Sequence, residues 1–294
     1  MKASVVISSK DRCEELRAAI KSCRSQTAAP EIIVIDDGSS DGTSEMVPTE
    51  FPEVRFFRNE TSKGYIVCRN AGAALACGDV VFSIDDDAEF STPLVIYQTL
   101  ADFDDPRVAV VAIPLIEPRY GERRLQFAPD NESVWVCDCF KGTAYAIRRD
   151  VFLKVGGFCT DMIHQGEEVD LSIRLLDCGL FVRLGRADPI VHHESPKRDL
   201  RRMHFFGRRN DLLFAFRNVP LMHLFNHSIG TTWNGLRAMV GATQRFAMLA
   251  GILRGWWDGL SILRGRAPVK SNTYRLYRQM RKWGARPIDQ LFPN

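Results

Sequence analysis

The stretch Val80-Val81-Phe82-Ser83-Ile84-Asp85-Asp86-Asp87-Ala88-Glu89-Phe90 decides how the rest of the chain is interpreted. Residues typical of a strand lead into three consecutive carboxylates, and strand alternation places Asp85 and Asp87 on one side and Asp86 on the other. Such closely spaced negative charges repel one another unless a cation neutralises them, and oxygen ligands favour Mg²⁺ or Mn²⁺. The alternative is a solvated acidic turn, but Ile84 and Phe90 flank the carboxylates where turns usually carry Gly, Pro or Asn. We therefore predict a divalent metal site.

The first hundred residues alternate short apolar runs with helical patterns. Strands are expected over 3–8, 32–35, 54–57 and 80–84, and helices over 11–26 and 66–76. This order predicts an α/β fold with a mainly parallel sheet and flanking helices, in which ligands bind beyond the carboxyl ends of the strands. Polar residues follow three of these strands: Ser8-Ser9, Asp36-Asp37 and Asp85-Asp86-Asp87. We expect these residues to meet at one rim of the sheet.

The loops exclude several classes of nucleotide and cation site. The chain has neither a Gly-x-Gly-x-x-Gly motif nor a Walker phosphate loop, so it lacks the phosphate cradle of a dinucleotide oxidoreductase or a P-loop ATPase. Asp37-Gly38-Ser39-Ser40-Asp41-Gly42 resembles the start of an EF-hand loop. The twelfth position of that loop is Pro48, where a bidentate Glu is required, so we reject the calcium interpretation.

Size and cysteine usage indicate an intracellular globular protein. A chain of 294 residues can bury one large α/β core, with or without an appendage. Its eight cysteines include no Cys-x-x-Cys pair, which favours free thiols in a reducing compartment. No signal peptide precedes the first predicted strand, and no apolar run reaches about 18 residues, the length needed to span a membrane. We expect a cytoplasmic protein.

Charge divides the chain into two regions. Residues 1–195 carry 21 Lys and Arg against 32 Asp and Glu, whereas residues 196–294 carry 18 against 4. An acidic body that handles cations is thus followed by a basic region suited to phosphates or anionic lipid. We place the boundary between an N-terminal domain over 1–198 and a C-terminal region over 199–294.

The basic region has the pattern of a long amphipathic helix. Apolar residues recur at spacings of three and four from Leu236 to Leu260, opposite polar residues, with a kink expected at Gly251 or Gly255. The helix either packs on the catalytic core or lies on a membrane interface, and the cations beside Trp256-Trp257 favour the membrane. Nucleic-acid binding is not expected, because aromatic residues at helical spacing would be buried and leave no stacking platform.

Two further polar groups are placed to face the acidic rim. A helix expected over 167–178 begins with Glu167, Glu168 and Asp170, which is more acid than a helix cap needs. His192 and His193 follow a strand-like run, and adjacent side chains at a strand end point to opposite faces. One of the two imidazoles can therefore join the metal site.

The ordered motifs resemble those of glycosyltransferase family 2, whose members have the GT-A fold. The resemblance covers residues from about 3 to about 219, and Arg208-Arg209-Asn210 is similar to a segment of rhamnosyltransferase-like members. The motifs are 5–12, 34–43, Asn70-x-Gly72, Gly78-Asp79 with Asp85-Asp86-Asp87, Gly142 with Arg148-Arg149, 155–158 and 166–171.

The resemblance implies that residues 1–198 form a catalytic domain, with a donor-binding half over about 1–115 and an acceptor half over about 116–198. It also implies a role for each matching residue. It implies Mg²⁺ or Mn²⁺ bound by Asp85, Asp87 and His192, or by His193 in place of His192. The catalytic base would be Glu168, where the family usually has Asp, with Asp170 and Glu167 as alternatives. The acceptor or diphosphate would lie near Gly142, Arg208 and Arg209. The donor would be bound by Ser8, Ser9, Arg12, Asp36, Asp37, Lys63, Arg69, Asp85 and Asp86.

The function implied is inverting transfer of a sugar from a nucleotide-diphosphate donor to a hydroxyl. A glycan or lipid-diphosphate-linked acceptor and the inner face of the plasma membrane are expected, in synthesis of a bacterial surface polysaccharide or lipid-linked glycan. A sugar-1-phosphate nucleotidyltransferase is the first alternative, although it needs a Gly-rich basic loop and residues 8–12 contain no glycine. A non-catalytic nucleotide-sugar-binding scaffold is the second, and Glu168 beside Asp85-x-Asp87 argues against it.

Overall fold

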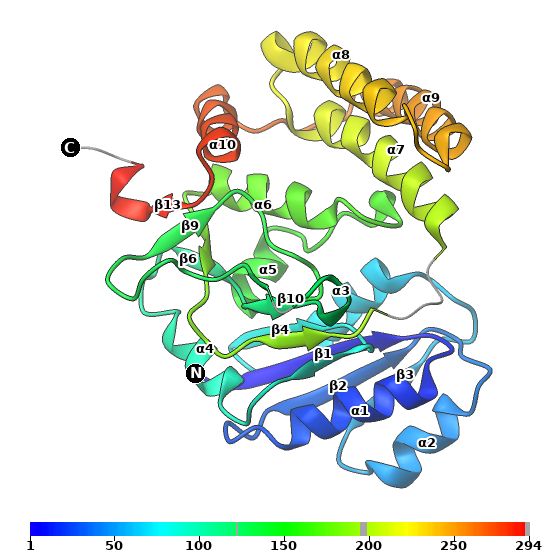
Figure 1. Cartoon of the computed structure of the whole chain (residues 1–294), viewed down its shortest axis with the longest axis vertical. Helices are drawn as coiled ribbons and strands as arrows, with labels where there is room; N and C mark the ends of the chain where they lie inside the picture. Colours follow the sequence, from blue (N-terminus) through cyan, green and yellow to red (C-terminus); the bar gives the residue numbers. More distant parts are fainter. Residues whose placement is uncertain (122, 195–198, 292–294) are drawn as a thin grey trace.

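The computed structural model of the protein describes residues 1–121, 123–194 and 199–291 (Figure 1). Its strands are β1 Ala3–Ser9, β2 Glu31–Asp36, β3 Arg55–Arg58, β4 Val80–Ile84, β5 Ala88–Phe90, β6 Val108–Ala112, β7 Leu115–Ile116, β8 Arg124–Leu125, β9 Trp135–Cys137, β10 Ala144–Arg148, β11 Phe181–Leu184, β12 Ile190–His192 and β13 Arg286–Pro287. Its α-helices are α1 Cys13–Arg24, α2 Thr43–Glu50, α3 Tyr65–Leu75, α4 Val95–Ala101, α5 Arg149–Lys154, α6 Glu167–Asp177, α7 Leu200–Asn218, α8 Leu221–Ala238, α9 Arg245–Ser261 and α10 Ser271–Trp283. Short 3₁₀ turns are η1 Pro118–Tyr120, η2 Thr160–Met162 and η3 Ile288–Gln290.

The N-terminal half forms the predicted parallel sheet. Strands β3, β2, β1 and β4 are neighbours in that order and all run parallel. Val5 and Ile7 of β1 belong to the hydrophobic cluster that includes α1, whereas Val6 points to the opposite cluster and packs against Gly72 of α3. Both faces are therefore covered, with α1 and α2 on one side and α3, α5 and α6 on the other (Figure 1).

The predicted fold class is confirmed, and the full sheet is mixed. Its nine strands have the order β13-β9-β11-β6-β10-β4-β1-β2-β3. Strand β10 lies between β4 and β6 and is antiparallel to both, whereas β6 and its other neighbour, β11, are parallel to each other. A smaller sheet has the order β5-β12-β7-β8, and its register places His192 opposite Ala88, directly after the acidic stretch.

Asp37 holds the loops that follow β2 and β3. Its carboxylate accepts hydrogen bonds from Asn59 Nδ2, Ser62 Oγ and the backbone N–H groups of Lys63 and Gly64, at 2.6 to 2.8 Å. Burial opposes its charge, but these four donors lower the pKa of Asp37 to about 2. The ionised carboxylate thus ties both loops to the rim of the sheet.

The C-terminal region joins the catalytic core. Phe214 of α7 and Tyr277 of α10 lie in the same hydrophobic cluster as Val6 and Leu175, and β13 adds an edge strand to the central sheet by pairing with β9. The region predicted over 199–294 is therefore not purely helical. Its predicted start borders residues 195–198, which lie outside the described residues.

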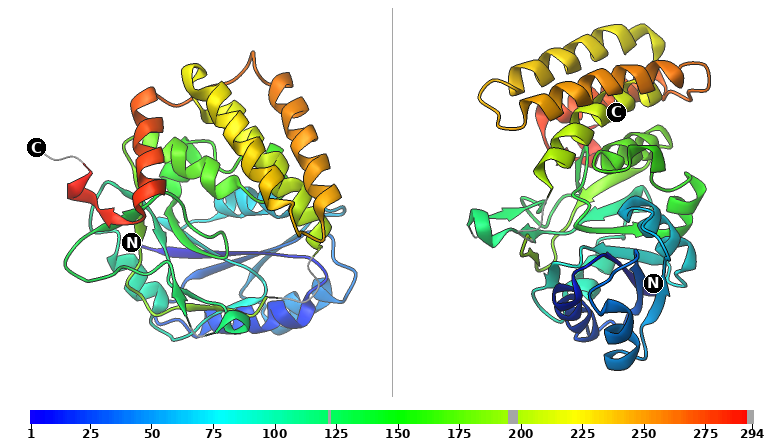
Figure 2. Two further views of the ribbon diagram at one scale, coloured as in Figure 1. Left: turned by 45° about the horizontal axis from the view of Figure 1, so that its top comes forward. Right: turned by 90° about the vertical axis from the view of Figure 1, so that its right-hand side faces the viewer.

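The prediction of one long helix is wrong. The chain breaks at residues 239–244, where Gly241 has φ +79°, a left-handed conformation that favours glycine. Helix α9 continues through Gly251 and Gly255, and both glycines let α9 approach α7 closely. A Cβ on Gly255 would lie 2.8 Å from the carbonyl oxygen of Arg209. The result is an antiparallel α8–α9 hairpin packed on α7, at the end of the molecule opposite α1 and α2 (Figures 1 and 2).

Substitution of Asp37 tests the loop anchor. We expect Asp37→Asn to lower the free energy of unfolding by about 2 kcal/mol at pH 7, because charge-assisted hydrogen bonds are lost. The folded pKa lies below the unfolded value of about 3.9, so this stabilisation is complete above pH about 4 and disappears as pH falls towards 2. Urea unfolding at several pH values measures it, with exposed Glu60→Gln as the control. An equal loss of unfolding free energy at pH 7 and pH 2.5 would show that the stabilisation does not come from the ionised carboxylate.

Substitution of Gly251 tests the close contact between α7 and α9. An added Cβ would collide with the carbonyl oxygen of Phe205, a backbone atom that a side-chain rotation cannot move. We expect Gly251→Ala to lower the free energy of unfolding by about 1–3 kcal/mol. Gly230 of α8 has no neighbouring atom within 4 Å, so Gly230→Ala should stabilise by up to about 1 kcal/mol. Equal effects of the two variants would disprove the contact.

Candidate active site

The predicted rim lines one open cavity of about 570 Å³ beyond the carboxyl ends of β1, β2 and β4. Residues from the start of α6 and α7 complete its wall. Its lining is Ser8, Ser9, Lys10, Arg12, Asp37, Ser62, Gly64, Tyr65, Arg69, Asp85, Asp86, Asp87, Gly142, Thr143, His164, Gln165, Glu167, Glu168, His192, Asp199, Arg202 and Met203.

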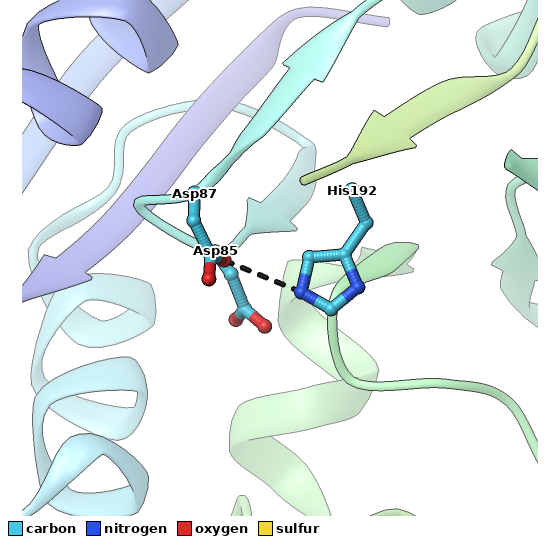
Figure 3. A group of neighbouring side chains, drawn as sticks. All are labelled: Asp85, Asp87 and His192. Carbon is cyan, nitrogen blue, oxygen red and sulfur yellow. Dashed lines mark ion pairs between the residues drawn. The ribbon is translucent and has the colours of Figure 1, made fainter. Parts of the chain in front are cut away.

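Asp85, Asp87 and His192 form a group that could hold a metal ion (Figure 3). One potential ligand atom from each residue lies within 4.8 Å of the others, and His192 Nε2 is 3.3 Å from Asp87 Oδ1. His192 Nδ1 faces Glu117 Oε1 at 3.5 Å, a contact that helps to orient the ring. Two carboxylates and one imidazole are a suitable donor set for Mn²⁺ or Mg²⁺.

The acidic stretch is a buried turn and not the end of a strand. Strand β4 stops at Ile84 and residues 86–87 form the turn, so the alternation argument used for Asp86 does not apply. Asp86 and Asp87 are buried, and Arg12 Nη1 donates to Asp86 Oδ1 at 2.8 Å and Asp87 Oδ2 at 3.0 Å. Burial raises the pKa of Asp86 to about 7, although the charge of Arg12 opposes the shift. The turn is therefore not solvated.

Arg69 connects the acidic turn with the start of α6. Its guanidinium is buried, with Nη2 2.5 Å from Asp85 Oδ1 and Nη1 3.3 Å from Glu167 Oε1. Burial disfavours the charge, but Asp85 and other neighbouring groups raise the pKa of Arg69 above its ordinary value. Thr143 donates a hydrogen bond to the second oxygen of Asp85 at 2.7 Å. Both oxygens of Asp85 are thus held in place.

Glu167 and Glu168 face the cavity together. Glu168 accepts a hydrogen bond from the Gly142 backbone N–H at 3.1 Å, and any side chain at Gly142 would collide with Glu168 and Arg69. Burial raises the pKa of Glu168, while Arg69 opposes the rise. Burial and the charge of Glu168 raise the pKa of Glu167 to about 8. A carboxylate with a raised pKa is suited to take up a proton.

Asp170 points away from the cavity. It is fully buried, and its oxygens accept hydrogen bonds from Asn218 Nδ2 at 2.8 Å and Arg174 Nε at 2.9 Å. A position two residues after Glu168 lies about 200° around the helix, which explains the opposite orientation. Asp170 connects α6 with α7 and does not line the cavity.

Several other predicted residues also lie outside the cavity lining. Asp36 is fully buried and accepts from the Ser39 backbone N–H at 2.9 Å. Lys63 has its backbone N–H on Asp37, but its side chain does not line the cavity. His193 pairs with Glu89 at 2.8 Å on the far side of β12. These positions do not support direct ligand contacts.

The two predicted arginines of α7 are structural. Arg209 donates to Asp258 Oδ2 of α9 at 2.6 Å and to the backbone carbonyl of Asp161 at 2.7 Å. Arg208 pairs with Asp211 on the same helix at 3.1 Å. Neither lines the cavity, so the structure does not support the predicted acceptor or diphosphate contact of this pair. Arg202, almost two turns earlier on α7, lines the cavity in their place.

Sequence reasoning missed part of the cavity wall. Tyr65 Oη accepts a hydrogen bond from the Gln165 backbone N–H at 2.8 Å, and its ring meets His164 edge-on and lies under Arg69. These residues adjoin motifs that were recognised, so their position next to those motifs was an available signal. Arg202 and Met203 carried no such signal, because only the tertiary placement of α7 brings them to the cavity.

Comparison with known proteins identifies the family. The family described as Glycosyl transferase family 2 matches residues 4–158. Glucosyl-dolichyl phosphate glucuronosyltransferase of Haloferax volcanii is 30% identical over 189 residues, which are 57% of this chain and 59% of the relative. Pre-mycofactocin glycosyltransferase of Mycobacterium tuberculosis is 29% identical over 226 residues, covering 69% of this chain and 46% of that protein. The chain thus spans about half the length of these relatives.

Solved structures share the fold. The mannosyltransferase PcManGT from Pyrobaculum calidifontis, in complex with GDP-Man and Mn²⁺, superposes with a TM-score of 0.62 at 17% identity, over 96% of this chain and 82% of that one. At that identity the likeness concerns the fold alone, and it agrees with the GT-A architecture predicted from the motifs. The match over residues 4–158 and the shared fold show that this chain belongs to glycosyltransferase family 2.

Proposed function

We propose that the protein transfers a sugar from a nucleotide-diphosphate donor to an acceptor hydroxyl. The observation that carries this proposal is that Asp85, Asp87 and His192 line the same cavity as Glu168. A cation-binding group on one side and a carboxylate of raised pKa on the other are what an inverting transfer requires. The solved relative that binds GDP-Man and Mn²⁺ supports the same class of donor and metal.

The donor half of the cavity would hold the nucleotide. Ser8 and Asp37, at the ends of β1 and β2, are placed for the nucleoside, and the Arg12 and Arg69 guanidinium groups lie beside the acidic turn. Mg²⁺ or Mn²⁺ bound by Asp85, Asp87 and His192 would neutralise the charge that develops on the leaving diphosphate. Arg12 keeps Asp86 and Asp87 in position for that role.

Glu168 is the proposed general base. Its side chain lines the cavity, and the Gly142 N–H fixes the oxygen that it contacts. The base takes the proton from the acceptor hydroxyl as that oxygen attacks the anomeric carbon from the face opposite the leaving group. Glu167 lies deeper and is paired with Arg69, so it is placed to tune Glu168 electrostatically.

The acceptor is proposed to be a glycan or a lipid-diphosphate-linked sugar at the inner face of the plasma membrane. A lipid-diphosphate-linked sugar is anionic, and the C-terminal region carries 18 Lys and Arg against 4 Asp. The corresponding process would be synthesis of a bacterial surface polysaccharide or a lipid-linked glycan. Among the described residues, no helix is both long enough and apolar enough to cross a membrane.

Removal of the metal tests the proposed donor chemistry. We expect Asp87→Asn, or addition of excess chelator to the wild type, to reduce donor turnover by about 10²-fold or more, because transition-state charge is no longer neutralised. Glu89→Gln is the matched control, since that carboxylate lies two residues away and pairs with His193. Turnover is measured as release of nucleoside diphosphate from candidate nucleotide sugars. Full turnover of the wild type in excess chelator would show that the reaction does not require a metal ion.

Substitution of Glu168 tests the proposed base. We expect Glu168→Gln to lower kcat by about 10²–10⁴-fold with donor binding unchanged, because proton removal is lost while the donor contacts remain. The wild-type rate should fall as pH decreases through the raised pKa of Glu168, and the variant should lack this dependence. Asp170→Asn is the control, expected to reduce stability more than kcat. If Asp170→Asn instead abolishes kcat in a folded protein, Glu168 is not the base.

A further inference from the structure

Helix α8 exposes a row of large apolar side chains that the fold leaves uncovered. They recur at intervals of one, three and four residues along the helix, and Phe225 is 72% exposed and Trp233 61%. An unpaired apolar row of this kind marks an interaction surface when it is contiguous. The row comprises Leu221, Met222, Phe225, Ile229, Trp233 and Leu236.

Helix α9 adds a second exposed row. Gly251, Gly255 and Gly259 face α7, and residues two positions away lie about 200° around the helix. The exposed row therefore lies on the side of α9 that α7 does not cover, and Trp257 is 72% exposed there. The row comprises Phe246, Leu249, Leu253, Trp257 and Leu260. Figures 1 and 2 place α8 and α9 together at the outer end of the molecule.

The charges around these rows are cationic. Between residues 221 and 264 the chain carries four arginines and one acid, Asp258. That acid is neutralised by Arg209 at 2.6 Å and Arg254 at 2.7 Å. Arg237 and Arg245 are exposed beside the loop that joins the two helices. The surface thus combines apolar rows containing tryptophan with a basic border.

We infer that the α8–α9 hairpin docks on the surface of a bilayer that contains anionic phospholipid, with both helices lying along that surface. Exposed Trp, Phe and Leu side chains enter the interfacial region, and arginines at the border contact lipid phosphates. A second copy of the chain is a poorer occupant, because a symmetric contact would bring the same arginines together. The positive charge of the arginines at the border favours anionic over neutral lipid.

The docking surface is connected directly to the catalytic cavity. Asp199, Arg202 and Met203, at the start of α7, line the cavity, and the same helix packs against the glycines of α9. Docking therefore holds the cavity at a fixed distance from the lipid headgroups. This inference gives the proposed membrane-linked acceptor a defined approach, and in that respect it rests on the proposed function.

Vesicle binding by the full chain tests the inference without requiring activity. The variant Phe225→Ser with Trp257→Ser removes two side chains that are each 72% exposed, so the fold should be retained. The matched control, Tyr97→Ser with Tyr120→Ser, removes aromatics that are 67% and 68% exposed on the catalytic body. Co-flotation is measured with vesicles of phosphatidylcholine alone and with 30% phosphatidylglycerol, at two salt concentrations, and thermal unfolding checks each variant.

We expect the wild type and the control to bind anionic vesicles equally, and the hairpin variant to bind at least tenfold more weakly. Binding should weaken in high salt and on neutral vesicles, because the arginines contribute electrostatically. Equal binding of the hairpin variant, or no binding of the wild type, would overturn the inference. A concentration-dependent dimer that the hairpin substitutions dissolve would also overturn it, in favour of a second copy. Sugar transfer to a soluble acceptor is measured separately, so either proposal can fail alone.

Discussion

The structure depends on balancing the negative charge of the turn Asp85-Asp86-Asp87. Two of these carboxylates are buried, and buried charges are tolerated only when they are paired with good geometry. Arg12, after β1, pairs with both buried carboxylates, and Arg69, on α3, pairs with the partly buried Asp85. Both elements must therefore pack closely around β4. The contact of Gly72 in α3 with Val6 in β1 allows α3 to come near enough.

The same charge balance couples the two sides of the cavity. The Arg69 guanidinium contacts Asp85 in the acidic turn and Glu167 at the start of α6, so one cation serves both sides of the cavity. Burial raises the pKa values of Glu167 and Glu168, the charge of Glu168 adds to the rise at Glu167, and Arg69 opposes both rises. Any ligand that changes the charge near Asp85 also changes the electrostatic potential at Glu168 through this contact. Under the proposed function, this contact would connect donor binding with the general base.

Local patterns predicted much of this arrangement. The strands and the acidic start of α6 follow from periodicity, and the rim follows from the rule that parallel strands end at one edge, whereas the turn at residues 86–87 was not predicted. The choice between His192 and His193 required the register of β12 on β5, which no single-sequence pattern gives. The orientation of Asp170 could have been predicted from the sequence, because a residue two positions after Glu168 lies on the other side of a helix. The ion-pair partners of Arg12 and Arg69 could not be predicted in this way, because they lie on elements that are far apart in the sequence.

Composition predicted that the C-terminal region is basic, but not which of its cationic side chains are exposed and which form ion pairs within the fold. Arg209 and Arg217 of α7 pair with acids of α9, η2 and α6, so they contribute to folding and their charge is not directed at a ligand. The net charge therefore overstates the cations that an anionic partner meets on α7. Arg237 and Arg245, near the α8–α9 loop, are exposed. The inner surface of α7 packs against the α/β domain and against the glycines of α9. The outer surface of the α8–α9 hairpin stays exposed, and its rows of large apolar side chains distinguish it from an ordinary protein exterior.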